Sequence, residues 1–196
     1  MNVLIIAEDP TQDYFILEPL VAAMLAELGK PRAKVRVCRD PVYRGINTVL
    51  KPESLEAIIR RYPMIDVFLL CVDRDGDENR RTQLDVREQS CAALLQQRRD
   101  VIFLAENAWQ EVEVWALAGC TDLPGEWRWR DLRAERDPKE AYFEPYVAQK
   151  GLTATPGAGR MILGRQAASR YGRVRQLCPE DIGALEERLR ERLGGQ

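Results

Sequence analysis

The sequence contains no histidine, and this absence removes several chemistries at the outset. Ser-His-Asp and Cys-His catalysis require an imidazole base, and many zinc sites require an imidazole ligand. Any hydrolytic chemistry in this chain must therefore use carboxylates, metal ions, lysine, arginine or tyrosine.

Cysteine is present, but without the spacing of a metal-binding knuckle. No two of the cysteines form a Cys-x-x-Cys pair, and their number is odd: they lie at Cys38, Cys71, Cys91, Cys120 and Cys178. We interpret them as reduced thiols of a cytoplasmic protein. Cys71 lies within an apolar run, and we expect it to be a small core residue.

Long apolar runs and a strong charge imbalance are also missing. No segment approaches membrane-spanning length, so we expect no membrane partner. The first residues have no basic flank and too short an apolar run for a signal peptide. Lysine and arginine together number 29 against 31 aspartates and glutamates, which gives no global signature of a polyanion partner and leaves a local one open.

The most informative segment of the sequence is residues 66–77, Asp-Val-Phe-Leu-Leu-Cys-Val-Asp-Arg-Asp-Gly-Asp. Its short apolar run is typical of a strand buried on both faces. The run ends in acids at alternate positions, Asp73, Asp75 and Asp77, with Gly76 to turn the chain. Carboxylates crowded at a strand end repel each other unless a cation lies between them, and Mg²⁺ prefers oxygen ligands.

The same acids are open to other interpretations. Aspartate and glycine are ordinary turn residues, so the acids can simply be solvated. A calcium-binding loop of the EF-hand type needs glycine at its sixth position. Here Gly76 is fourth, counted from Asp73, which excludes that loop.

Strand-like and helix-like segments alternate through about residue 118. We expect strands at residues 2–7, 35–38, 67–72 and 101–104, and helices at residues 11–28, 52–61, 80–98, 111–117, 160–171 and 179–193. The first helix would begin at Thr11 as N-cap and end at Gly29. In the helix over 80–98, the side chains expected to face inward are those of Leu84, Cys91, Leu94 and Leu95.

This alternation predicts an α/β fold, a Rossmann-like parallel sheet of about four strands with helices on both faces, plus a C-terminal helical extension. Residues 1–118 would form the core. Residues 119–196 would pack on it as part of one structural domain, and residues 121–146 would be either a strand edge or an excursion. At 196 residues the chain is long enough for one such core.

Acids follow three of the predicted strands. Glu8 follows the first, the aspartate cluster follows the third, and Glu106 or Glu111 follows the fourth. Ligands of such sheets bind beyond the carboxyl ends of the strands. We therefore predict a magnesium or manganese site there, with Glu113 as a further candidate.

Two geometric expectations follow. Glu8, Asp73 and Asp75 should converge if the first and third strands are neighbours. Glu111 and Glu113 lie two apart on a predicted helix, so only one can face the site. We favour Glu111, with Trp115 packing as core.

A basic stretch free of acids carries Arg160, Arg165, Arg170, Arg173 and Arg175. Arginine can grip phosphate through its planar fork, which favours a nucleic-acid contact. A solvated helix face, paired with acids such as Glu180 and Asp181, is the other interpretation.

The acidic motifs resemble those of Toprim domains, which occur in topoisomerases, primases and small nucleases. Residues 5–13, Ile-Ile-Ala-Glu-Asp-Pro-Thr-Gln-Asp, are similar to the first Toprim motif, a strand that ends in glutamate. Residues 72–77 are similar to its Asp-x-Asp motif. Residues 111–118, Glu-Val-Glu-Val-Trp-Ala-Leu-Ala, resemble a segment of a Toprim-like family linked with phage defence. Where the Toprim turn usually carries glycine, this chain has Asp9.

The resemblance covers roughly residues 2–118 and implies a Toprim-like core related to overcoming-lysogenization-defect nucleases. It implies that Glu8 is the general acid/base and that Asp73 and Asp75 hold the metal. We predict Glu8 as a further metal ligand, and Asp77 and Glu111 as auxiliary ligands or orienting residues. The expected function is Mg²⁺- or Mn²⁺-dependent cleavage of DNA or RNA in phage defence, with an ATPase chain as partner. The alternative is a non-catalytic module that binds nucleic acid or a partner.

Overall fold

The computed structural model describes residues 1–98 and 100–194. The last two residues of the predicted 119–196 extension therefore lie outside the described part. In chain order the elements are β1 (Asn2–Ala7), α1 (Tyr14–Glu27), β2 (Lys34–Val37), α2 (Ile46–Val49), α3 (Pro52–Arg61), β3 (Val67–Asp73), α4 (Arg80–Leu94), β4 (Ile102–Ala108), α5 (Glu113–Ala118), α6 (Trp129–Ala134), the π-helical turn η1 (Lys139–Phe143), α7 (Glu144–Gln149), α8 (Arg160–Ser169), α9 (Tyr171–Leu177), the π-helical turn η2 (Pro179–Gly183) and α10 (Ala184–Gly194).

The four strands form one all-parallel sheet in the order β2-β1-β3-β4. Ile5 of β1 lies opposite Val37 of β2 on one side and opposite Leu69 of β3 on the other. The chain adds β2 to one side of β1 and then crosses to add β3 on the other, so the topological switch point lies between β1 and β3. The predicted α/β fold with about four parallel strands is confirmed, and so is the adjacency of the first and third strands.

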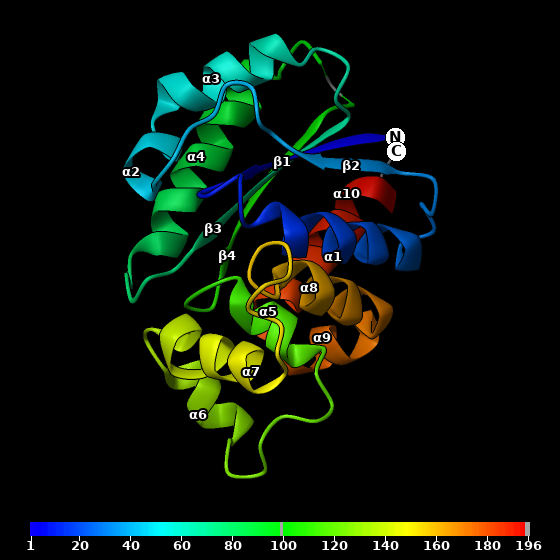
Figure 1. Ribbon diagram of the computed structural model, residues 1–196. Coiled ribbons are helices and arrows are strands. Elements are labelled where there is room, and N and C mark those ends of the chain that lie inside the picture. Colours follow the sequence, from blue (N-terminus) through cyan, green and yellow to red (C-terminus); the bar gives the residue numbers. More distant parts are fainter. Residues whose placement is uncertain (99, 195–196) are drawn as a thin grey trace.

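Helices cover both faces of the sheet, as predicted (Figure 1). On one face, Leu4, Phe68 and Leu70 pack with residues of α3 and α4 in one buried cluster. On the other face, Ile5 and Leu69 join a larger cluster that includes residues of α1, α5, α8, α9 and α10. The strands read as continuous apolar runs because both of their faces are buried.

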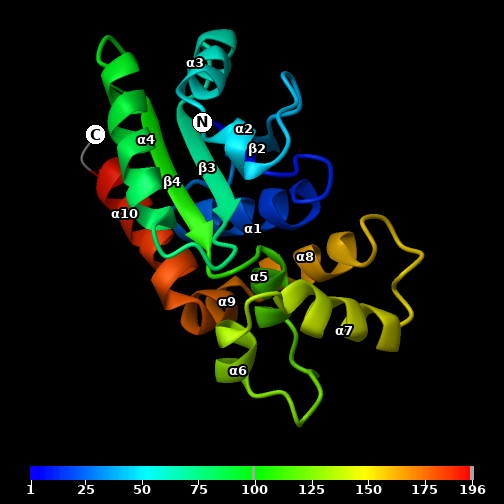
Figure 2. The ribbon, with the colours of Figure 1, turned by 90° about the vertical axis from the view of Figure 1, so that its left-hand side faces the viewer.

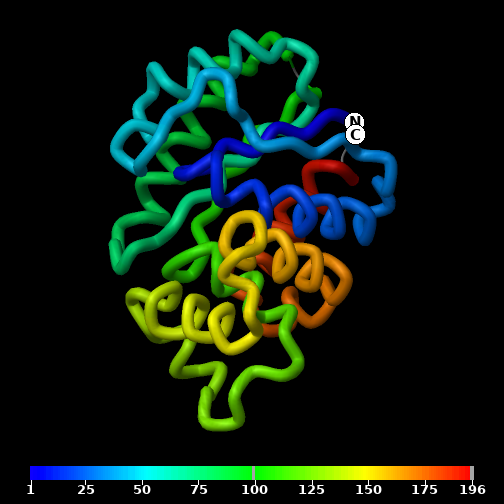
Figure 3. The backbone as a smooth tube through the Cα atoms, in the orientation of Figure 1, coloured from blue at the N-terminus to red at the C-terminus, as the bar shows by residue number. Residues whose placement is uncertain are grey.

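Helix α8 of the C-terminal part makes close backbone contacts with two helices of the core. A Cβ added at Gly164 would collide with the carbonyl oxygen of Phe15 in α1, and one added at Gly119 would collide with the backbone of Ala167. The backbone tube shows α8 lying against α1 and α5 (Figure 3). Only glycine permits so close an approach at these two positions.

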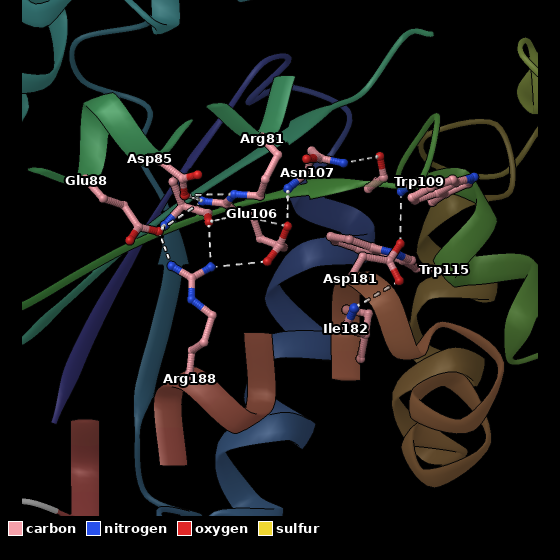
Figure 4. Close-up of polar contacts among 12 residues, drawn as sticks. Arg81, Asp85, Glu88, Glu106, Asn107, Trp109, Trp115, Asp181, Ile182 and Arg188 are labelled. Carbon is pink, nitrogen blue, oxygen red and sulfur yellow. Dashed lines mark hydrogen bonds and ion pairs between the residues drawn. The ribbon is translucent and has the colours of Figure 1, made fainter. Parts of the chain in front are cut away.

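An ion-pair network joins α10 to the sheet. Arg81 of α4 and Arg188 of α10 both contact Glu106, at 3.1 and 3.2 Å, and both donate to the carbonyl oxygen of Ala105. Figure 4 shows the two guanidinium groups reaching Glu106 from their separate helices, with Glu88 bonded to both. Glu106 is buried within β4, which raises its pKa to about 7, and the two arginines partly offset the effect of burial.

Several predicted boundaries were wrong, for local reasons. Thr11 is not an N-cap: its N–H and hydroxyl both donate to Oδ1 of Asp9, and α1 begins at Tyr14. The predicted fourth strand runs on through Glu106 to Ala108, so Glu106 lies inside the strand. Leu94, predicted to face inward, is 46 % exposed.

The segment 121–146 is mainly helical rather than a strand edge. Its alternating tryptophans contact helical neighbours instead of a strand. Trp127 packs edge-on against Tyr142 with ring centroids 5.0 Å apart, and Trp129 donates from Nε1 to the carbonyl oxygen of Leu177 at 2.9 Å. Tertiary contacts of large aromatic side chains therefore decide the conformation of this segment.

The five cysteines are buried and free, and Cys71 is in the core as expected. Among the helices of the described ranges, none has the length and apolar character that crossing a membrane requires.

Candidate metal and catalytic site

The carboxyl ends of β1 and β3 bring the predicted acids to one edge of the sheet. Glu8 directly follows β1, Asp73 is the last residue of β3, and Asp75 lies in the turn that follows. Because β1 and β3 are parallel neighbours, these residues meet at the switch point. Figure 2 shows β3 and β4 ending above α5, the helix that borders the site.

The turn after β3 is fixed by Gln110, which lies beyond the neighbouring strand β4. The Gln110 carbonyl oxygen accepts hydrogen bonds from the N–H groups of Arg74 at 2.8 Å and Asp75 at 3.2 Å. Its side-chain Oε1 accepts from the N–H of Gly76 at 2.9 Å. Gln110 and Asp75 both have left-handed backbones, with φ of 74° and 51°. These hydrogen bonds join the turn after β3 to the loop after β4, each of which contains a left-handed residue. They hold Asp75 close to Glu111.

Three carboxylates form the centre of the site. Asp73, Asp75 and Glu111 each offer one oxygen, and these oxygens all lie within 4.8 Å of one another. Oxygen donors at this spacing suit a hard divalent cation such as Mg²⁺ or Mn²⁺.

Backbone amides orient the carboxylates and leave one oxygen of each available. Asp73 Oδ1 accepts from the N–H of Val112 at 2.9 Å, and Glu111 Oε2 accepts from the N–H of Lys139 at 2.7 Å. Glu8 Oε1 accepts from the N–H of Ile46 at 3.1 Å. These bonds fix the carboxylates before any ligand arrives.

Within residues 1–98 and 100–194, two buried side-chain atoms have no hydrogen-bond partner, and both lie at or near the acid site. They are Oε2 of Glu8 and Nε of Arg80. The charge of Arg80 acts on both Glu8 and Asp75. Buried polar atoms are rarely left unsatisfied, so these two indicate that the site accepts a polar ligand or ion.

A small pocket of about 190 Å³ opens on the site. Six acids and two bases are among its lining residues, which are Glu8, Asp9, Gln12, Asp13, Asp73, Glu111, Glu113, Lys139 and Arg160. The excess of acids makes the pocket attractive to cations.

The crowded acids have raised pKa values. Burial, followed by the charge of Glu113 and of the other nearby carboxylates, holds the pKa of Asp73 well above its ordinary value. Burial raises the pKa of Asp13 and of Glu111 to about 7. The pKa of Glu8 is also raised, by burial first and then by the charge of Asp75. Such shifts are typical of functional sites.

Glu111 and Glu113 both line the pocket, in different roles. The premise that they share a helix was wrong, because α5 begins only at Glu113. Glu111 joins the acid cluster, as favoured. Glu113 is buried and forms an ion pair with Arg160, which also donates to it from Nε at 3.0 Å. Trp115 is fully buried, as expected.

Asp77 and Glu106 lie apart from the acid cluster. Asp77 Oδ1 accepts from the N–H of Asn79 and Oδ2 accepts from Gln83, so its carboxylate is engaged by the residues at the start of α4. Glu106 is held by Arg81 and Arg188. Neither belongs to the group of acids whose oxygens are spaced for a metal ion, and Glu8, predicted as a ligand, lies outside that group as well.

The predicted arginines do not form one surface. Arg160 is buried against Glu113, while Arg170 and Arg173 donate to the carbonyl oxygens of Gly119 and Ala118. Arg175 pairs with Glu186, whereas the expected acids Glu180 and Asp181 pair with Arg133. Arg165 is exposed.

Sequence analysis missed Asp13, Gln110 and Lys139. Asp13 is buried, and its Oδ2 accepts from the N–H of Asp9 at 2.9 Å. Its one signal in the sequence is its place shortly after Glu8, directly before the first helix. Asp9 is not in a left-handed conformation; its side chain accepts from Thr11 and forms the turn.

Comparison with protein-family models, with curated proteins and with solved structures finds no match to this chain.

Proposed function

We propose that this protein is a Mg²⁺- or Mn²⁺-dependent nuclease that hydrolyses phosphodiesters of DNA or RNA. The observation that carries the proposal is the convergence of oxygens from Asp73, Asp75 and Glu111 within 4.8 Å at the switch point of a parallel sheet. The Toprim-like motifs around Glu8 and Asp73 point to the same chemistry.

The residues of the site fit a divalent cation. Asp73, Asp75 and Glu111 would hold it, because each has an oxygen placed for coordination and all three donors are hard. Their mutual repulsion is relieved by a cation. When bound, the ion supplies charge stabilisation at the phosphate and lowers the pKa of a bound water.

Glu8 is the group best placed to move a proton. One of its oxygens is fixed by the N–H of Ile46, and the other is buried without a partner. Its raised pKa makes it a stronger base than an ordinary glutamate. Glu8 would accept a proton from the attacking water and return it to the leaving oxygen.

Basic groups border the acids and would meet the phosphate. Lys139 lines the pocket, and the side chain of Arg136 lies over Gly76, with its Nε 3.2 Å from where a Cβ would stand. Arg136 is exposed, and its charge acts on Asp75. A phosphate held against the acid cluster would gain from these nearby cations.

The test is a nuclease assay on the purified chain, with labelled single-stranded and duplex DNA and RNA. We expect cleavage that requires Mg²⁺ or Mn²⁺, stops with chelator and is lost in Asp73→Asn. The matched control is Glu78→Gln, because Glu78 is an exposed acid of the same loop, outside the cluster. Equal activity in Asp73→Asn and wild type would contradict the proposal. Nucleic-acid binding without cleavage would favour the non-catalytic module.

A further inference from the structure

We propose that a second hollow, beside the acid site, binds an unpaired base of a single-stranded nucleic acid. This rests on the proposed function for the nature of the substrate. The hollow has a volume of about 410 Å³ and is lined by Trp109, Trp129, Arg130, Arg133, Leu177 and Pro179, among others. This volume falls within the range of small-molecule sites.

Trp129 supplies the stacking surface. Its ring is oriented by the hydrogen bond from Nε1 to the carbonyl oxygen of Leu177, and the residue is partly exposed. No aromatic ring or cation of the described residues lies on it. Trp115, by contrast, is fully buried, and Trp127 packs against Tyr142. An oriented indole in a hollow bordered by Leu177 suits base stacking.

Arg130 supplies the cation for the adjoining phosphate. It is exposed, and its guanidinium makes no hydrogen bond or ion pair with the described residues. Arg133, in the same hollow, is already engaged by Glu180 and Asp181. The hollow therefore combines a stacking ring with one uncommitted guanidinium, the pairing that single-strand binding sites use.

Trp109 connects the hollow to the acid site. Its backbone N–H donates to Asp181 at 2.9 Å, which fixes its position at the end of β4 (Figure 4). The guanidinium of Arg74 lies 4.2 Å from the centre of its ring. Arg74 stands between Asp73 and Asp75 in the chain, and Trp109 is two residues from Glu111. A strand whose base enters the hollow would thus carry its backbone past Arg74 to the acids.

Base pairing would prevent this placement, because a base in a duplex already has both faces stacked and its edge paired. The hollow therefore selects single strands or unpaired ends. This selection depends on Trp129 and Arg130, neither of which belongs to the acid site.

The test measures binding in chelator, where cleavage cannot occur. Fluorescence anisotropy would follow labelled oligodeoxythymidylate, its RNA counterpart and a blunt duplex. We expect Trp129→Leu to weaken single-strand binding by about 5- to 100-fold, the range of one lost stacking contact. Trp129→Phe, which keeps a ring, should stay near wild type, and Trp127→Leu is the matched control. Arg130→Gln should weaken binding. It should also reduce, by about one, the steepness with which the logarithm of the binding constant falls with the logarithm of the salt concentration.

Equal affinities of wild type and a folded Trp129→Leu would overturn the inference, as would tighter binding of the duplex. A Trp129→Phe variant as weak as Trp129→Leu would also overturn it, because the loss would then come from the hydrogen bond to Leu177. Cleavage by wild type together with unchanged binding by Trp129→Leu would leave the nuclease proposal intact. Loss of binding in Trp129→Leu without any cleavage by wild type would support the hollow and contradict the nuclease.

Discussion

The backbone N–H of Val112 donates a 2.9 Å hydrogen bond to Oδ1 of Asp73 and so ties the end of β3 to the turn after β4. This bond from the main chain orients the carboxylate of Asp73. Because the carboxylate is already fixed before a ligand binds, little free energy of binding is lost in ordering it. The account therefore predicts that Asp73 can be changed without loss of the fold.

Asp73→Asn should leave the metal-free protein as stable as wild type or more so, because the amide oxygen can still accept from Val112 and one repelling charge is gone. Wild type should gain about 3 kcal/mol at a hundredfold excess of Mg²⁺ over its Kd. For a chain of this size that is about 5–10 °C in Tm. The variant should lose most of this gain in melts followed by circular dichroism. Glu78→Gln should keep it, and an equal metal response in Asp73→Asn would contradict the assignment.

The metal-free protein should become more stable as the pH falls from about 8 to about 5.5. Folding raises the pKa of Asp13 from 3.8 to about 7 and that of Glu106 and Glu111 from 4.5 to about 7, and it also raises the pKa of Asp73. In this window the folded state holds protons that the unfolded chain has lost, so its free energy of unfolding falls as the pH rises.

The absence of histidine makes this pH response easier to assign, since no imidazole titrates in the same range. We expect Tm to rise by on the order of 5 °C over the window. Saturating Mg²⁺ should reduce or reverse the trend, because the metal binds the deprotonated acids. A metal-free Tm that rises with pH between 5.5 and 8 would be the opposite of this prediction.

Two substitutions of Gln110 distinguish its role in positioning the acids for Mg²⁺ from its effect on the stability of the fold. Gln110→Ala and Gln110→Gly both remove the acceptor for the N–H of Gly76, and each should lower Mg²⁺ affinity by about tenfold. Glycine also relieves the left-handed backbone at φ 74°, so the glycine variant should be more stable than the alanine variant by about 1 kcal/mol. Calorimetric titration and urea unfolding measure the two effects. Unchanged Mg²⁺ affinity in both variants would show that Gln110 does not position the acids.

Arg160 should act mainly on stability. Arg160→Met leaves Glu113, only 4 % exposed, without its ion-pair partner, which should cost about 3–5 kcal/mol. Adding Glu113→Met should restore much of this loss. Arg165→Gln, at an exposed position of the same helix, is the control and should change stability by less than about 0.5 kcal/mol. Urea unfolding that gives the same stability for Arg160→Met and Arg165→Gln would contradict a structural role for Arg160.

The parts of the fold that the sequence predicted are those whose signals are local. Buried parallel strands appear as apolar runs, and β1 was predicted with its observed bounds. The acids at the ends of β1 and β3 could be placed together because parallel strands carry their carboxyl ends to one edge. Helix α3 was also predicted with its observed bounds, since Pro52 marks its first turn.

The parts that sequence reasoning missed depend on long-range contacts. Glu113 and Arg160 are 47 residues apart, and neither residue alone indicates that the other neutralises it. The role of Gln110 depends on loops from two strands meeting, which no local pattern encodes. Arg160 was placed in a basic surface for the same reason: its charge was visible in the sequence, but its burial was not.

Anomalous diffraction from a crystal soaked in Mn²⁺ shows whether Asp73, Asp75 and Glu111 hold a divalent cation. We expect an anomalous peak within coordination distance of all three carboxylates, about 2.0–2.3 Å from their oxygens. The same soak of Asp73→Asn should show a weak peak or none. A fully soaked wild-type crystal without a peak among these three acids would contradict the account.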